Sequence, residues 1–106
     1  MKNADLQEYY QRLSVDFDKY IQMEVISKNG KTKKERENAK SRLSYILQGF
    51  EIYVERNPQL LDFITSSGVN KYPNYEILDE FLTHRFFKSD LEQLLFYLKE
   101  EIDKEE

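Results

Sequence analysis

The chain has 106 residues, a formal net charge of −4 and no cysteine. Since a domain takes roughly 150 residues, we expect a single domain over residues 1–106, and 8 Tyr and 7 Phe supply enough apolar area for a folded core. Without cysteine the chain can hold neither disulfides nor thiolate metal sites, which suits a protein of the reducing cytoplasm.

The chain offers no segment for membrane insertion. No apolar stretch approaches the ~20 residues of a membrane-spanning helix, and Met1–Asp5 lack the apolar core of a signal peptide. We therefore expect no membrane contact and a cytoplasmic location. Lysine-rich usage with frequent Ile, Asn and Tyr suggests a low-G+C coding source, such as a bacterium or its phage.

Apolar residues at steps of three and four predict a first helix from about Asp5 to Ser27. Its expected core stripe is Leu6, Tyr10, Leu13, Phe17, Ile21 and Val25. A turn at Asn29 and Gly30 follows, and Thr32 with Glu35 has the form of a capping box that starts a second helix.

The second predicted helix ends near Arg56, because the residue before Pro58 avoids helical geometry. Its stripe comprises Ala39, Leu43, Ile46, Leu47, Phe50 and Val54. Asn57 is expected to cap a short third helix that opens at Pro58, buries Leu60, Leu61, Phe63 or Ile64, and ends before Gly68.

Two further helices are expected in the C-terminal third. Ile77, Leu78, Phe81 and Leu82 define a short fourth helix, and Ser89 with Glu92 predicts the capped start of a fifth. The fifth helix has the most regular stripe, formed by Leu91, Leu94, Leu95, Leu98 and Ile102. Together these patterns predict an all-α protein, a compact antiparallel bundle of three long and two short helices.

The residues do not assemble into a recognisable catalytic or metal site. His84 is the one histidine, and a triad with Ser89 lacks support because Ser89 is better used as a helix cap. Glu80 and His84 share a helix face, but two ligands do not make a metal site. We therefore expect a non-enzymatic protein with no catalytic residue, no metal and no cofactor.

Charge is segregated along the chain. Lys28–Arg42 holds seven basic and two acidic residues, whereas Ser89–Glu106 holds two and seven. Lys33 and Lys34 are expected in the first turn of the second helix, where cations oppose the helix dipole unless an anion binds there, and Lys31 lies just before it. They form a candidate anion site, against the simpler interpretation of a solvated loop.

The second helix also carries apolar residues away from its stripe. Tyr45 and Ile52 point nearly opposite Leu43, and Gly49 near them is easiest to explain by close approach of another helix. That helix is either another part of this chain or a partner. Phe96 likewise faces away from the stripe of the fifth helix, and it is a candidate for the same patch.

These features favour a protein-protein interaction module of the inhibitor, immunity, antitoxin or adaptor type. It would act through a helix face formed by Tyr45, Gly49, Ile52 and Phe96, on a protein partner or by self-association as a homodimer. The alternative is a nucleic-acid or anion-binding protein that uses the basic segment Lys28–Arg42.

Overall fold

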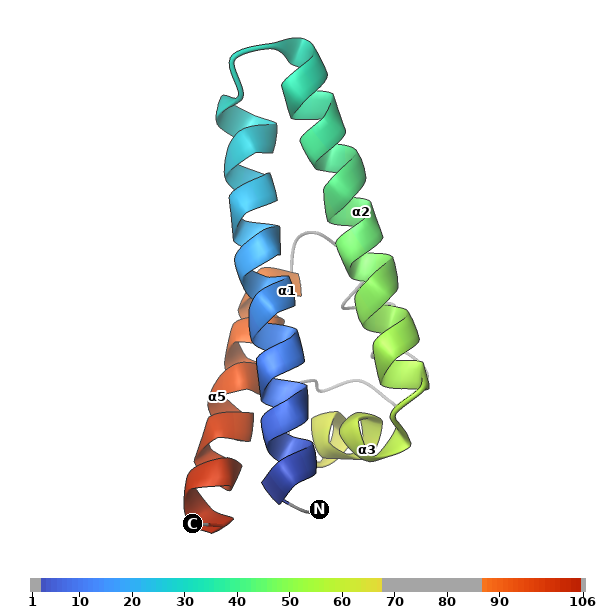
Figure 1. Ribbon diagram of the computed structural model, residues 1–106, viewed down its shortest axis with the longest axis vertical. Coiled ribbons are helices and arrows are strands. Elements are labelled where there is room, and N and C mark those ends of the chain that lie inside the picture. The colour runs from blue at the N-terminus through green and yellow to red at the C-terminus, as the bar shows by residue number, and fades with distance from the viewer. Residues whose placement is uncertain (1–2, 68–86, 106) are drawn as a thin grey trace.

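Three long helices and one short helix make up the part of the chain that the structure describes (Figure 1). The computed structural model describes residues 3–67 and 87–105. Within these ranges the elements are α1 (Asn3–Asn29), α2 (Lys33–Glu55), α3 (Pro58–Ser67) and α5 (Phe87–Glu105). The all-α prediction is confirmed for these ranges, and the predicted fourth helix lies outside them.

The helices form an elongated bundle. α1 and α2 make an antiparallel hairpin, α5 packs antiparallel to α1, and α3 turns across the end of the hairpin near the N-terminus (Figure 1). The molecule measures 47 × 29 × 21 Å, and its radius of gyration is 14.6 Å. A compact domain of this length has a radius of gyration of about 13 Å.

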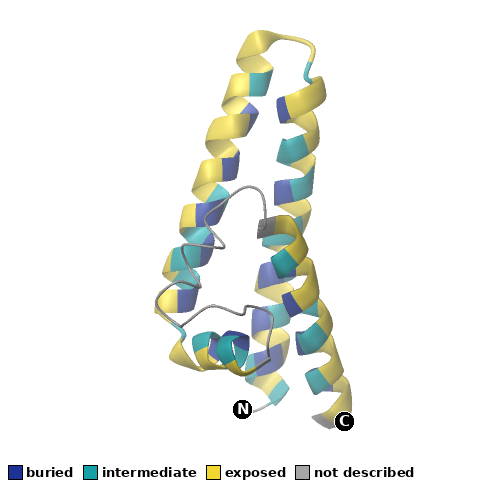
Figure 2. Ribbon diagram, turned by 180° about the vertical axis from the view of Figure 1, so that it is seen from behind, coloured by how far each residue is buried: buried dark blue, intermediate teal, exposed yellow. Residues whose placement is uncertain are grey.

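The hairpin extends beyond the start of α5, which divides the bundle into two regions (Figure 2). We call residues 20–46, the end of the hairpin that contains the turn, the arm. The other described residues form the base. Lys88 at the start of α5 reaches the arm through an ion pair of 3.6 Å with Glu24.

The base holds most of the core. All four helices contribute fully buried side chains there, which are Leu6, Leu13, Phe50, Val54, Leu60, Ile64, Leu91, Leu94 and Leu98. The stripes predicted for α2 and α5 are therefore confirmed, and Leu95 packs against this core while partly exposed. Of the four alternatives for α3, Leu60 and Ile64 are buried, and Leu61 and Phe63 pack at the edge.

The stripe predicted for α1 is right in the base and wrong in the arm. Beyond Leu13 the buried residues are Tyr20 and Ser27, while Val25 is 52% exposed. Leu6, Leu13, Tyr20 and Ser27 repeat every seven residues, the spacing of helices that supercoil around each other. The predicted steps of four turn the stripe by about 40° each, which carries Val25 away from α2.

The turn between α1 and α2 follows its sequence signals. Thr32 caps α2 as predicted, because its Oγ1 accepts from the backbone N–H of Glu35 over 3.1 Å. The reciprocal bond differs from a strict capping box: the Glu35 carboxylate accepts from the N–H of Lys31, one residue earlier, over 3.1 Å. Arg36 donates to the carbonyl of Gly30 over 2.7 Å and closes the turn.

Two other predicted caps are corrected. Asn57 does begin α3 through its backbone carbonyl, which accepts from Leu60 over 2.9 Å. Its side chain instead caps α2, because the amide donates to the carbonyl of Tyr53 over 2.7 Å. Ser89 is not an N-cap, since α5 already includes Phe87 and places Ser89 within the helix. Among the described helices, none is both long and apolar enough to cross a membrane.

Candidate interaction surface

The residues predicted to face away from the α2 stripe are exposed. Tyr45 is 70% and Ile52 47% exposed, and because they are seven residues apart both lie on the same side of α2. An alanine Cβ at position 49 would meet no described atom within 4 Å outside its own helix. Neither α3 nor α5 therefore covers this surface. We call Tyr45, Gly49 and Ile52 the hairpin face.

Tyr45 also borders a groove between α1 and α2. This groove has a volume of 430 Å³. It is continuous with a depression of 580 Å³ nearer the turn, since Met23 and Arg42 line both. We call the two together the hairpin groove. Its lining includes Lys19, Gln22, Met23, Ile26, Arg42 and Ile46.

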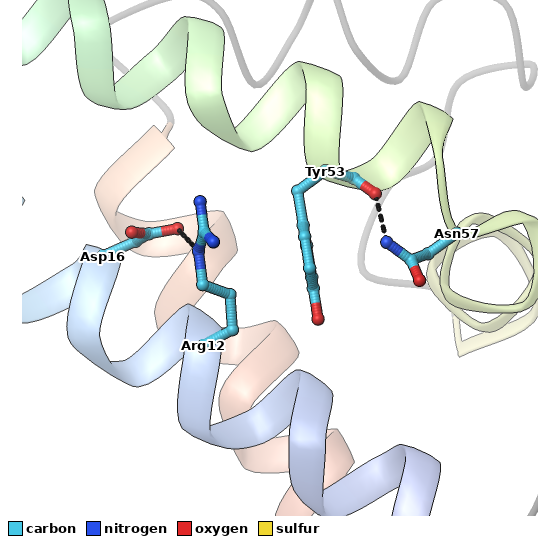
Figure 3. A network of polar contacts seen from close by, with 4 residues as sticks. All are labelled: Arg12, Asp16, Tyr53 and Asn57. Carbon is cyan, nitrogen blue, oxygen red and sulfur yellow. Dashed lines mark hydrogen bonds and ion pairs between the residues drawn. The ribbon is translucent and has the colours of Figure 1, made fainter.

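Arg12 of α1 lies beside the ring of Tyr53 of α2 in the base (Figure 3). The guanidinium of Arg12 lies 5.0 Å from the ring centroid of Tyr53, and its Nε donates to Asp16 over 3.3 Å. Tyr9 meets the same ring edge to face at 6.2 Å. These contacts help to hold α1 and α2 together in the base.

The hydroxyl of Tyr53 is buried and has no hydrogen-bond partner among the described residues. Burial and the nearby Glu8 carboxylate raise the pKa of Tyr53 above the ordinary tyrosine value of 10.0, and burial likewise raises the pKa of Tyr9 and Tyr20. All three phenols are therefore neutral near pH 7, so their hydroxyls supply no charge to the surface.

Phe96 lies on a different surface. It is 60% exposed on α5, where its ring meets Tyr97 edge to face at 5.9 Å. The described residues that line a depression of 510 Å³ beside it all belong to α5. Since α1 separates α5 from the hairpin face, the structure does not bring Phe96 together with Tyr45 and Ile52 (Figure 1).

The three lysines of the predicted anion site diverge. Lys31 lines the hairpin groove, while Lys33 lies 3.9 Å from Glu37 in an exposed ion pair, and neither Lys33 nor Lys34 lines that groove. One of the free backbone donors at the start of α2 is also taken, because Thr32 accepts from the N–H of Glu35. The turn is therefore a basic surface rather than a built anion pocket.

No cluster of three or more His, Asp or Glu side chains that could hold a metal occurs within residues 3–67 and 87–105. Both Glu80 and His84 lie outside the described residues.

Sequence reasoning missed the α1 side of the groove. Lys19, Met23 and Ile26 flank the Tyr20–Ser27 stripe, but the shifted stripe predicted for α1 assigned its apolar side to Val25. A seven-residue spacing search would have found them, because it places Met23 beside the seam with α2.

Comparison with protein-family models, curated proteins and solved structures finds no match to this chain. The surface itself is therefore the basis for inferring function.

Proposed function

We propose that this protein is a non-enzymatic interaction module that binds a protein partner through the hairpin face. It would work as inhibitors, immunity proteins, antitoxins and adaptors do, by covering or bridging a partner in the cytoplasm. The observation that carries this proposal is the exposure of Tyr45 and Ile52 on either side of Gly49. Aromatic and aliphatic side chains that project from a rigid helix are typical anchors of protein interfaces.

Gly49 supports a helical partner in particular. Glycine inside a helix costs about 1 kcal/mol relative to alanine, and no described side chain packs on it to explain its presence. A missing Cβ lets the backbone of another helix approach closely. The partner surface is therefore expected to lie across α2 at this residue.

The test is Ile52→Glu, which places a charge on the hairpin face. Because Ile52 is half exposed, the variant should remain folded, with a change of only about 0.5 kcal/mol in the free energy of unfolding. Partner capture by the immobilised protein, and self-association measured by light scattering, should both be lost.

Ser44→Glu is the matched control. It adds the same charge to an exposed position of α2 that lines a separate depression with Tyr20 and Lys40. Equal association by the parent and both variants would contradict the proposal. If Phe96→Glu loses association and Ile52→Glu does not, the interface lies on α5 instead.

Nucleic-acid binding through the basic segment stays the alternative. It predicts salt-sensitive binding to DNA or RNA that falls when Lys31, Lys33 and Lys34 are changed together to Gln, with helicity unchanged. The divergence of these lysines leads us to expect no such binding.

A further inference from the structure

We propose that the hairpin groove binds an amphipathic helix whose flanks are acidic. This inference rests on the proposed function and names the partner of the same surface, since Tyr45 belongs to both the hairpin face and the groove. It draws on the apolar floor of the groove, on its cationic walls and on its length.

The floor of the groove is apolar and partly covered. Met23 and Ile46 pack against the core with one side and line the groove with the other. Exposed side chains of Ile26 and Tyr45 extend this surface along both helices. The apolar stripe of an amphipathic helix, with anchors at i, i+4 and i+7, is complementary to such a floor.

The walls of the groove are cationic. Lys19 projects from α1 and Arg42 from α2, and Lys31 lies at the end near the turn. None of the three has a described carboxylate within ion-pair distance, whereas Arg12 in the base is paired with Asp16. Glu35 is the one acidic residue of the lining, and it is bonded to the N–H of Lys31.

The charge of the whole arm points the same way. Residues 20–46 carry seven basic and three acidic side chains, a formal net of +4, although the chain as a whole carries −4. The rest of the chain therefore carries −8. A partner with acidic flanks would be attracted to the arm and repelled by the base, which orients it on the groove.

The length of the groove suits a short helix. From Lys19 to Asn29 it follows α1 over eleven residues, and the ten steps between them span about 15 Å at the rise of an α-helix. A partner helix of three turns spans this distance. Phosphate backbones need no apolar floor. The combination of Met23 and Ile46 with cations that have no described ion-pair partner therefore favours an acidic helix over a nucleic acid.

The test uses two designed helical peptides of 18 residues, about five turns, that share one leucine stripe and differ in their flanks. One carries Glu and the other Lys at the flanking positions. Binding to the full chain is measured by fluorescence anisotropy, and the methyl signals of Met23 and Ile46 are followed by NMR. We expect the Glu peptide to bind and to shift both methyl signals.

Charge reversal then locates the contact. Lys19→Glu with Arg42→Glu should weaken the Glu peptide by at least about tenfold and improve binding of the Lys peptide. Lys28→Glu with Lys40→Glu makes the same change in net charge on a depression lined by other residues, and it should weaken the Glu peptide by less than about threefold.

Several results would overturn the inference. Equal weakening by the two double variants would show that only the net charge of the chain matters. Equal binding of the Glu and Lys peptides would show that the groove binds apolar stripes regardless of the flanking charge. The proposed function would then still hold, but the acidic partner would be ruled out. If double-stranded DNA displaces the Glu peptide and the methyl shifts are lost, the groove binds the phosphate backbone of a nucleic acid instead. If neither peptide binds while Ile52→Glu still abolishes partner capture, the interface excludes the groove.

Discussion

The base and the arm use the same two helices but bury them to different extents (Figure 2). In the base, α3 and α5 close the hairpin from two sides, and the core side chains are fully buried. In the arm, the described core consists of Tyr20, Ser27, Ala39 and Leu43. The base therefore supplies most of the stability, and the arm keeps apolar and cationic side chains available on its outer side.

Small residues make the two-helix arm feasible. Ser27 and Ala39 are buried near the turn, and the hydroxyl of Ser27 donates to the carbonyl of Glu24 over 2.7 Å, so its burial leaves no unpaired donor. Small side chains let α1 and α2 approach each other without a third helix. Because these side chains are small, they do not fill the groove beside them.

The largest effect should come from the base. Leu98→Ala empties a fully buried position where α5 meets the core, and it should cost about 2 to 5 kcal/mol in the free energy of unfolding. Leu95→Ala, at a partly exposed position of the same helix, should cost less. Urea denaturation of both variants measures the difference. If Leu95→Ala costs as much, α5 is buried more deeply than the structure shows.

The corresponding change in the arm should be smaller and local. Leu43→Ala removes the largest aliphatic side chain of the arm core, and we expect a loss of about 2 kcal/mol, since the adjacent surface can relax into the space. Amide hydrogen exchange should accelerate in residues 20–46 before it does in the base. Uniform acceleration along the chain would mean that arm and base unfold as one unit.

Two glycine substitutions should have opposite signs. An alanine Cβ at Gly30 would lie 2.7 Å from the backbone carbonyl of Ile26, so Gly30→Ala should cost about 1 to 3 kcal/mol as the turn shifts. At Gly49 an alanine Cβ would meet no described atom outside its own helix, so Gly49→Ala in the interior of α2 should stabilise the protein by about 0.5 to 1 kcal/mol. Thermal melts measure both. A destabilising Gly49→Ala would show that something packs on this residue.

High pH should weaken both regions through their tyrosines. The raised pKa of Tyr20 in the arm, and of Tyr9 and Tyr53 in the base, means that the folded state keeps protons which the unfolded state loses near its ordinary pKa of 10.0. Stability is then fully present below that value and falls as the pH rises through the folded pKa values. Urea titrations from about pH 8 to pH 11 should show this fall. Tyr20→Phe should reduce its slope, and an unchanged slope would contradict the burial argument.

The smallest effect is expected at the hydroxyl of Tyr53. Because this buried oxygen has no described partner, Tyr53→Phe removes an unsatisfied polar atom and keeps the ring contacts with Arg12 and Tyr9. The free energy of unfolding should stay the same or rise by up to about 1 kcal/mol. A clear loss of stability in urea denaturation would reveal a hydrogen bond at this oxygen.

Much of the fold follows from local patterns. The stripes of α2 and α5 were predictable because Leu43, Phe50, Leu91 and Leu98 recur at helical spacing, and helical spacing is a property of the chain itself. The cap at Thr32 was predictable for the same reason, since its partner is three residues away.

The sequence by itself therefore determined which of the described segments are helical, where the first turn lies and that its charge is positive. Which side of α1 would be covered in the arm was decided by tertiary structure. Val25 became exposed and Tyr20 buried because supercoiling against α2 selects a seven-residue repeat. The groove at Met23 and Arg42 depends on how α1 and α2 pack against each other. The separation of Phe96 from Tyr45 depends on the packing of α5 against α1. The periodicity of a single helix does not indicate which other helix will pack against it.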